Sequence, residues 1–197
     1  HYLGRPGIFG MEEALRQQPA DVLKVVLFGP ESTGKTTLAR DLAEHYQTSW
    51  VPEYAREYLQ DKWDREQKAC EPEDLLPIAI GQMRLENTLA AKANRLLICD
   101  TDLLETKVYS EVYYLGYCDP VLEQAALRNT YDLYFLTGID VPWQADDLRD
   151  KPDEREGMFV TFRHALEENN RRFIILEGSR EERLQKAIIH IDKLLVP

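Results

Sequence analysis

Short apolar segments alternate with longer amphipathic segments along this chain. The apolar segments are rich in β-branched and aliphatic residues, which is typical of buried strands. We expect strands at 24–28, 49–51, 95–99, 132–136 and 172–176. Between them, apolar residues recur with helical spacing, which predicts helices at 36–46, 53–59, 73–92, 103–115, 121–129, 158–168 and 181–195.

This alternation predicts an α/β fold of three layers. Strands that are separated by helices require right-handed crossovers, which produce a mainly parallel five-stranded sheet with helices on both faces. The 197 residues, 44% of them hydrophobic, can bury one core, so we expect a single domain over residues 11–197. Residues 1–10 precede the first methionine and are interpreted as the remnant of a purification tag and linker. The polar segments 61–72 and 138–157 are expected to be loops, the second a lid.

The first predicted strand leads into a glycine-rich turn. Residues 29–36 read GPESTGKT, which matches the spacing G-x-x-x-x-G-K-[ST]. Glycines in this spacing let successive backbone N–H groups point at a polyphosphate, and the following helix directs its N-terminus at the same anion. Lys35 is expected to reach the β- and γ-phosphates of ATP, and the Thr36 hydroxyl to hold Mg²⁺. The residues expected to contact the nucleotide here are Gly29, Ser32, Thr33, Gly34, Lys35, Thr36 and Thr37.

Two carboxylates follow the apolar strand at 95–99, spaced so that both can face the site. Asp100 ends the strand, where P-loop enzymes bind Mg²⁺ directly or through water, and we expect it to be a magnesium ligand. Asp102 lies farther out, where a carboxylate can bind a ribose hydroxyl or accept its proton. The alternative is that Asp102 caps the helix that begins at Leu103.

The segment WVPEYAREY, residues 50–58, places aromatic, acidic and basic residues just after the second predicted strand. Glu53, Tyr54 and Arg56 are interpreted as a carboxylate for acceptor hydroxyls, an aromatic wall and a guanidinium for phosphate or substrate. Two alternatives stay open. Tyr54 and Tyr58, four residues apart, can be core residues, and Glu53 can be the acidic residue of a helix N-terminus.

Two arginines and a glycine-serine pair complete the set of site residues expected from the sequence. Arg149 and Arg155 lie in the charged segment after the fourth strand, where arginines of a mobile lid can close over the γ-phosphate and exclude water. Arg149 is the preferred catalytic candidate, although charge runs are usually solvated. Gly178 and Ser179 follow the last strand and are expected to line the adenine pocket, or to form only a tight turn.

Composition narrows the function classes. A formal net charge of −11 repels polyanions, which argues against nonspecific binding to nucleic acid or acidic lipid. Three cysteines without metal-ligand spacing favour a reducing compartment, and no apolar run is long enough to span a bilayer. We therefore expect a cytoplasmic protein whose partner is a small molecule. The sequence does not determine the oligomeric state.

Several motifs together resemble a known family. GPESTGKTTLA, PEYAREY, IAIGQ, ICDTDLLET and PWQADDLR occur in the order found in the ribosylnicotinamide kinase domain of NadR-type bacterial NAD regulators. The resemblance covers the chain from Leu23 onward and implies a P-loop kinase fold. It also implies transfer of the ATP γ-phosphate to the 5′-hydroxyl of nicotinamide riboside, giving nicotinamide mononucleotide. Some members carry an aromatic residue where this chain has Pro52, so Trp50, Tyr54 and Tyr113 are the candidates for the nicotinamide wall.

Two other functions are compatible with the same motifs. One is the same chemistry on another nucleoside or small acceptor. The other is a regulatory module that hydrolyses ATP slowly and acts through a partner. An acceptor site is what separates a kinase from such a switch, and the acidic residues at the strand ends favour the kinase.

Overall fold

The computed structural model describes residues 7–114, 116–141 and 154–197. Its sheet contains strands that pair only in parallel, in the order β2-β3-β1-β4-β5. The strands are β1 (Leu23–Phe28), β2 (Trp50–Val51), β3 (Leu96–Asp100), β4 (Leu133–Thr137) and β5 (Phe173–Leu176). The prediction of a parallel five-stranded sheet is confirmed.

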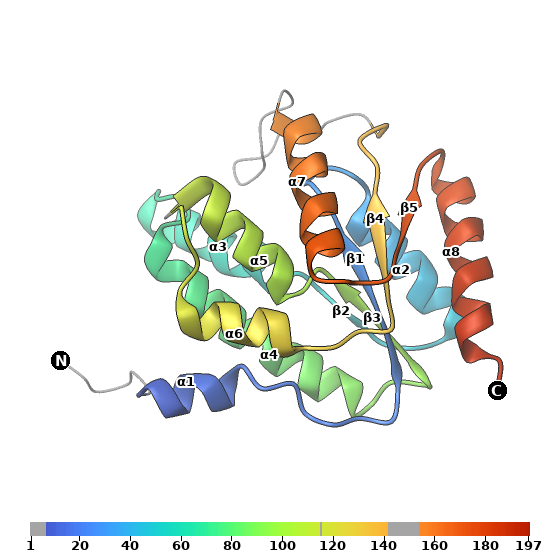
Figure 1. The fold of residues 1–197 in the computed structure, drawn as a ribbon, viewed down its shortest axis with the longest axis horizontal. Helices are drawn as coiled ribbons and strands as arrows, with labels where there is room; N and C mark the ends of the chain where they lie inside the picture. Colours follow the sequence, from blue (N-terminus) through green and yellow to red (C-terminus); the bar gives the residue numbers. More distant parts are fainter. Residues whose placement is uncertain (1–6, 115, 142–153) are drawn as a thin grey trace.

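Helices cover both faces of this sheet (Figure 1). They are α1 (Ile8–Ala14), α2 (Lys35–Tyr46), α3 (Tyr54–Glu66), α4 (Leu75–Ala90), α5 (Leu103–Tyr109), α6 (Pro120–Arg128), α7 (Arg155–Glu168) and α8 (Arg180–Leu195). Helices α2 and α8 pack on one face, and α4, α5 and α7 pack on the other. Within the described ranges, no helix combines the length and the apolarity needed to cross a membrane.

The central strand β1 shows why its sequence is apolar without interruption. Val25 and Leu27 point into the cluster formed with α2 and α8, and Val26 and Phe28 point into the cluster formed with α5 and α7. All four side chains are fully buried. A strand that is covered on both faces has no solvent-facing positions, so the alternation of apolar and polar residues disappears.

The N-terminal helix lies partly inside the segment that was expected to be a tag remnant. Helix α1 begins at Ile8, and Leu15, directly after the helix, is fully buried in a cluster contributed mainly by α4 and α6. Residues 8–10 therefore belong to a helix of the fold. The sequence pattern did not predict this helix.

Helix α3 is longer than predicted. The prediction of a loop at 61–72 is wrong for its first half, because α3 continues to Glu66. The extra turns carry Lys62, whose ammonium bonds Asp74 at 2.5 Å and Glu71 at 3.0 Å. These contacts pair a nearly buried cation with the turn before α4, and they stabilise a polar segment that shows no apolar periodicity.

The segment predicted as one helix at 103–115 is divided into α5 and a π-helical turn, Ser110–Tyr114.

Gly81 of α4 is required by the close approach of Tyr54. A Cβ atom at this position would lie 2.0 Å from the Tyr54 ring, which is buttressed by Tyr58. We expect Gly81→Ala to lower the free energy of unfolding by about 2 kcal/mol, because the overlap outweighs the gain in helix propensity. Gly157→Ala in α7 is the matched control, since a Cβ there meets nothing within 4 Å. Urea denaturation of both variants tests this, and equal effects would contradict it.

Candidate active site

The phosphate-binding turn connects β1 to α2 in the conformation that the motif predicts. Gly29 (φ 148°) and Gly34 (φ 84°) have positive φ, and a Cβ at Gly29 would lie 2.6 Å from the Thr137 hydroxyl. A side chain is therefore excluded at Gly29 by both backbone and space. The turn encloses a cavity of about 170 Å³. Its lining residues are Glu31, Ser32, Thr33, Gly34, Lys35, Thr36, Thr37, Glu53, Arg56 and Val141.

The Lys35 ammonium lies inside the turn. It donates to the carbonyl oxygens of Gly29 (2.7 Å) and Pro30 (2.8 Å), and the side chain is 5% exposed. Burial lowers the pKa of Lys35, but Glu105, Glu31 and the other nearby carboxylates more than offset this, so the pKa is raised above its usual value. The lysine is therefore charged at neutral pH and is positioned beside the phosphate cavity.

Thr36 and Asp100, the two residues predicted to bind Mg²⁺, are in contact. The Thr36 hydroxyl donates to Asp100 Oδ2 at 2.8 Å. The other carboxylate oxygen, Oδ1, is buried and has no hydrogen-bond partner within the described part of the chain. Burial raises the pKa of Asp100 to about 6, although Lys35 and the Thr36 hydrogen bond lower it. An unpartnered buried carboxylate oxygen beside a hydroxyl fits the ligand preference of Mg²⁺.

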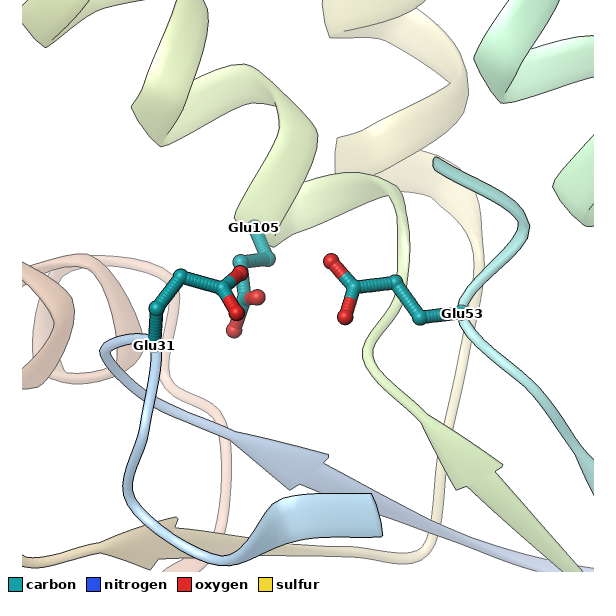
Figure 2. Close-up of side chains that lie close together, drawn as sticks. All are labelled: Glu31, Glu53 and Glu105. Atoms are coloured by element: carbon teal, nitrogen blue, oxygen red, sulfur yellow. The ribbon is translucent and has the colours of Figure 1, made fainter. Parts of the chain in front are cut away.

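Three glutamates converge at the site, and Figure 2 shows their carboxylates pointing toward one another. Glu31 comes from the phosphate-binding turn, Glu53 precedes α3, and Glu105 lies in the first turn of α5. One carboxylate oxygen of each lies within 4.8 Å of the others. Glu105 is buried and accepts the Gly29 N–H at 2.9 Å, so it also fixes the phosphate-binding turn. Burial is the main cause that raises the pKa values of Glu53 and Glu105.

Gln82 of α4 holds Glu53 in place. Its side-chain oxygen accepts the N–H of Tyr54 at 2.9 Å, and its side-chain nitrogen donates to the Pro52 carbonyl at 3.2 Å. The backbone is therefore clamped on both sides of Glu53. Gln82 lies in the motif IAIGQ, and no role was predicted for it. Glu31 and Glu105 were not predicted as site residues, although they lie in the motifs GPESTGKT and ICDTDLLET.

A larger cavity of about 380 Å³ adjoins the phosphate cavity, and Glu31 and Glu53 line both. Its walls are apolar and aromatic side chains of α3, α4 and the segment that contains α5 and the π-helical turn, namely Leu59, Leu75, Ile78, Tyr109, Tyr113 and Tyr114. Of the three aromatic candidates, Tyr113 lines this cavity, whereas Trp50 and Tyr54 line a different hollow on the other side of Glu53. Arg40 lies 5.8 Å over the Trp50 ring.

The contacts of Asp102 are those expected from the capping alternative. Asp102 accepts the Glu105 N–H at 3.2 Å and the Tyr134 hydroxyl at 2.5 Å, and it is 2% exposed. It is not among the described residues that line the larger cavity. Helix α5 begins directly after it, and the side chain caps the first turn of this helix.

The buried carboxyl of Asp102 makes the free energy of unfolding depend on pH. Burial raises its pKa from 3.8 to about 6, although Tyr134 and Glu105 lower it, so the folded state binds the proton more tightly than the unfolded state. The stabilisation of the folded state that results is fully present only below pH 3.8 and is lost as the pH rises through 6. Asn can keep the cap without the charge. We expect the free energy of unfolding of Asp102→Asn relative to wild type to increase by about 2 kcal/mol between pH 4 and pH 7. Urea denaturation at both values checks this, and a pH-independent difference would contradict it.

A third cavity, of about 430 Å³, adjoins the phosphate cavity on the side away from the glutamates. Gly178 and Ser179 line it, and Ser179 also caps α8. Arg183 donates to the Thr33 carbonyl at 2.7 Å and was missed in the sequence analysis. Arg155 donates to the carbonyls of Ser32 (3.3 Å) and Val141 (2.6 Å), so it fastens the phosphate-binding turn to the segment after β4. Arg149 and most of the expected lid, 142–153, lie outside the described residues.

Two curated relatives are similar over most of this chain. The trifunctional NAD biosynthesis/regulator protein NadR of Salmonella typhimurium is 26% identical over 90% of the chain, and that of Escherichia coli is 30% identical over 81%. The match covers 44% and 39% of those proteins, so the chain spans about two fifths of the length of the curated relatives it matches.

Solved structures share the fold. NadR protein in complex with NAD and AMP-PNP has a TM-score of 0.73 at 22% identity, over 88% of this chain and 49% of that one. NadR protein in complex with NR has a TM-score of 0.69 at 23% identity, over 88% and 51%. Deoxyadenosine kinase from M. mycoides has a TM-score of 0.59 at 13% identity, over 86% and 99%. The expected three-layer P-loop kinase fold is confirmed.

A family model described as AAA domain matches residues 24–183, from β1 into α8, and includes the phosphate-binding turn, Asp100 and the three glutamates. The chain belongs to this AAA domain family of P-loop proteins.

Proposed function

We propose that this chain is an ATP-dependent kinase that transfers the γ-phosphate to the 5′-hydroxyl of nicotinamide riboside. The observation that carries the proposal is the junction of two cavities, because Glu31 and Glu53 line both the phosphate cavity and the larger one. A nucleoside in the larger cavity would present its hydroxyl where the phosphate cavity opens. The similarity to NadR proteins, including one solved in complex with NR, supports this choice of acceptor.

Each side chain has a role in the proposed transfer. ATP would place its phosphates in the turn around Lys35 and its adenine in the cavity lined by Gly178 and Ser179. Thr36 and Asp100 would hold Mg²⁺, which neutralises phosphate charge when bound. The acceptor hydroxyl would pass its proton to Glu53 while its oxygen bonds to the γ-phosphorus, and the bond to the β–γ bridging oxygen breaks to leave ADP.

Three arginines would act on the nucleotide side of the site, at the phosphates or at the turn that binds them. Arg56 lines the phosphate cavity and is suited to bind the γ-phosphate. Arg155 would act mainly by holding the phosphate-binding turn, because its guanidinium already donates to backbone carbonyls. Arg149 remains the candidate for a residue that closes over the γ-phosphate.

A panel of nucleosides tests the proposal. Nicotinamide riboside, nicotinic acid riboside, uridine, cytidine and deoxyadenosine are each incubated with the protein, Mg²⁺ and γ-labelled ATP, and the labelled products are separated. We expect nicotinamide mononucleotide to form with the highest kcat/KM. Preference for a different nucleoside would leave a kinase and overturn the acceptor. ATP hydrolysis that no acceptor stimulates would favour the regulatory module instead.

A further inference from the structure

Carboxylates dominate the charge of the larger cavity. Glu31, Glu53, Glu105 and Glu154 line it, and they come from four separate segments of the chain. None of its described lining residues is Lys, Arg or His. A cavity in which one sign of charge gathers inside low-dielectric walls focuses the electrostatic field and favours a ligand of the opposite sign.

Lys35 and Arg56 line the phosphate cavity and are not among the described residues that line the larger one. Lys35 donates to the Gly29 and Pro30 carbonyls, and Arg56 lines the phosphate cavity and the hollow beside Trp50. Burial is the largest cause of the raised pKa values of Glu53 and Glu105, and Glu31 raises both further, although Lys35 lowers both. Bound ATP would add further negative charge at the junction. The described lining of the cavity therefore carries negative charge without a lining cation, and a positively charged ligand can balance it.

Aromatic side chains line the same cavity. Tyr109 and Tyr113 lie nearly parallel, with ring centroids 5.5 Å apart and an interplanar angle of 20°. The Tyr113 hydroxyl donates to Glu154 at 3.1 Å, which fixes a carboxylate at the rim of the aromatic wall. The face of a tyrosine ring attracts cations, and the attraction strengthens when the site is shielded from water. A flat ring with a delocalised positive charge matches this combination of tyrosine faces and carboxylates.

We propose that the larger cavity selects its acceptor by positive charge, so that a nucleoside with a cationic pyridinium base is accepted and a neutral base of the same shape is rejected. This inference rests on the proposed function, because it concerns the acceptor of the same transfer. The inference goes beyond the proposed function in two ways. It names charge, rather than shape or amide hydrogen bonding, as the basis on which acceptors are discriminated, and it assigns Glu154 a part in this discrimination.

The first test compares nicotinamide riboside with its 1,4-dihydro form, which differs by one added hydride and carries no charge. We expect kcat/KM for the reduced riboside to be lower by about 30-fold, since it loses both the carboxylate and the cation–π attraction. The two ribosides have nearly the same size, so shape alone does not separate them by this factor. Values within threefold of each other would overturn charge selection.

The second test removes one charge from the cavity. Glu154→Gln should reduce the ratio of the two kcat/KM values by at least threefold, because the amide keeps the size and can still accept from Tyr113. Glu156→Gln is the matched control, since Glu156 is exposed and lies two residues away on α7 outside the cavity lining. Equal ratios in both variants would overturn the role of Glu154.

A binding measurement separates failure of this inference from failure of the proposed function. The cation 1-methylnicotinamide and neutral nicotinamide are titrated into the wild-type protein and Glu154→Gln by calorimetry. We expect the cation to bind more tightly to the wild type and to lose this advantage in the variant. If the cation is preferred but nicotinamide riboside is not phosphorylated, the proposed function is overturned and charge selection stands. If both ribosides turn over equally, charge selection is overturned and the kinase stands.

Discussion

Replacing Lys35 with alanine should lower kcat more than 100-fold and leave the fold intact. The ammonium is buried inside the phosphate-binding turn and holds its charge because carboxylates surround it. It is therefore preorganised for the charge that develops on the transferring phosphoryl group, and the loss of even one such donor costs about 100-fold or more. The two carbonyls that it now binds belong to the turn, whose shape is also fixed by the Glu105 bond to Gly29.

Steady-state kinetics with saturating ATP and acceptor measure this loss, and a thermal melt reports on the fold. Lys92→Ala is the control, because Lys92 is an exposed lysine two residues after the end of α4 and far from the turn in sequence. A folded Lys35→Ala protein with near-normal turnover would contradict the assignment of the ATP site to this turn. A variant that fails to fold is excluded by its melt, and Lys35→Arg then provides the test, because it keeps the charge but moves it.

The fold was largely predictable because hydrophobic periodicity is a local signal. Every strand was predicted within one residue of its observed ends, since a strand buried on both faces reads as an uninterrupted apolar run. Helix ends were less predictable. The last turns of α3 depend on Lys62 reaching Asp74, and α1 depends on Leu15 packing against α4 and α6. These are tertiary contacts, which periodicity does not contain.

The site was predictable only where one short motif contains all the partners. The phosphate-binding turn has this property, and the contact between Thr36 and Asp100 followed because strand ends meet at one edge of a parallel sheet. The acceptor side is built from segments that are far apart in sequence. Asp102 and Glu53 were the predicted candidates for the base, and Glu105 was not considered, although Asp102 caps α5 and Glu105 lines the cavity.

Whether a carboxylate lines the cavity or caps a helix predicts which one acts in the proposed transfer. Glu53→Gln should lower kcat by about 100-fold or more, because an amide cannot accept the hydroxyl proton. Asp102→Asn should change kcat only a few-fold, since Asp102 caps α5 outside the cavity lining. Glu57→Gln is a matched control on α3, because Glu57 is exposed. ATP binding, measured by calorimetry, should survive in all three variants.

The pH dependence gives Glu53 a signature that a structural role does not produce. Burial, together with Glu31 and Asp100, raises the pKa of Glu53 well above 4.5, and a base must be deprotonated to act. The rate of wild type should therefore fall as the pH decreases through this raised pKa, and the acid limb should disappear in Glu53→Gln. Loss of turnover in Asp102→Asn with a normal Glu53→Gln would reverse the assignment. A pH profile that is identical in wild type and Glu53→Gln would leave Glu53 as a helix-terminal acid.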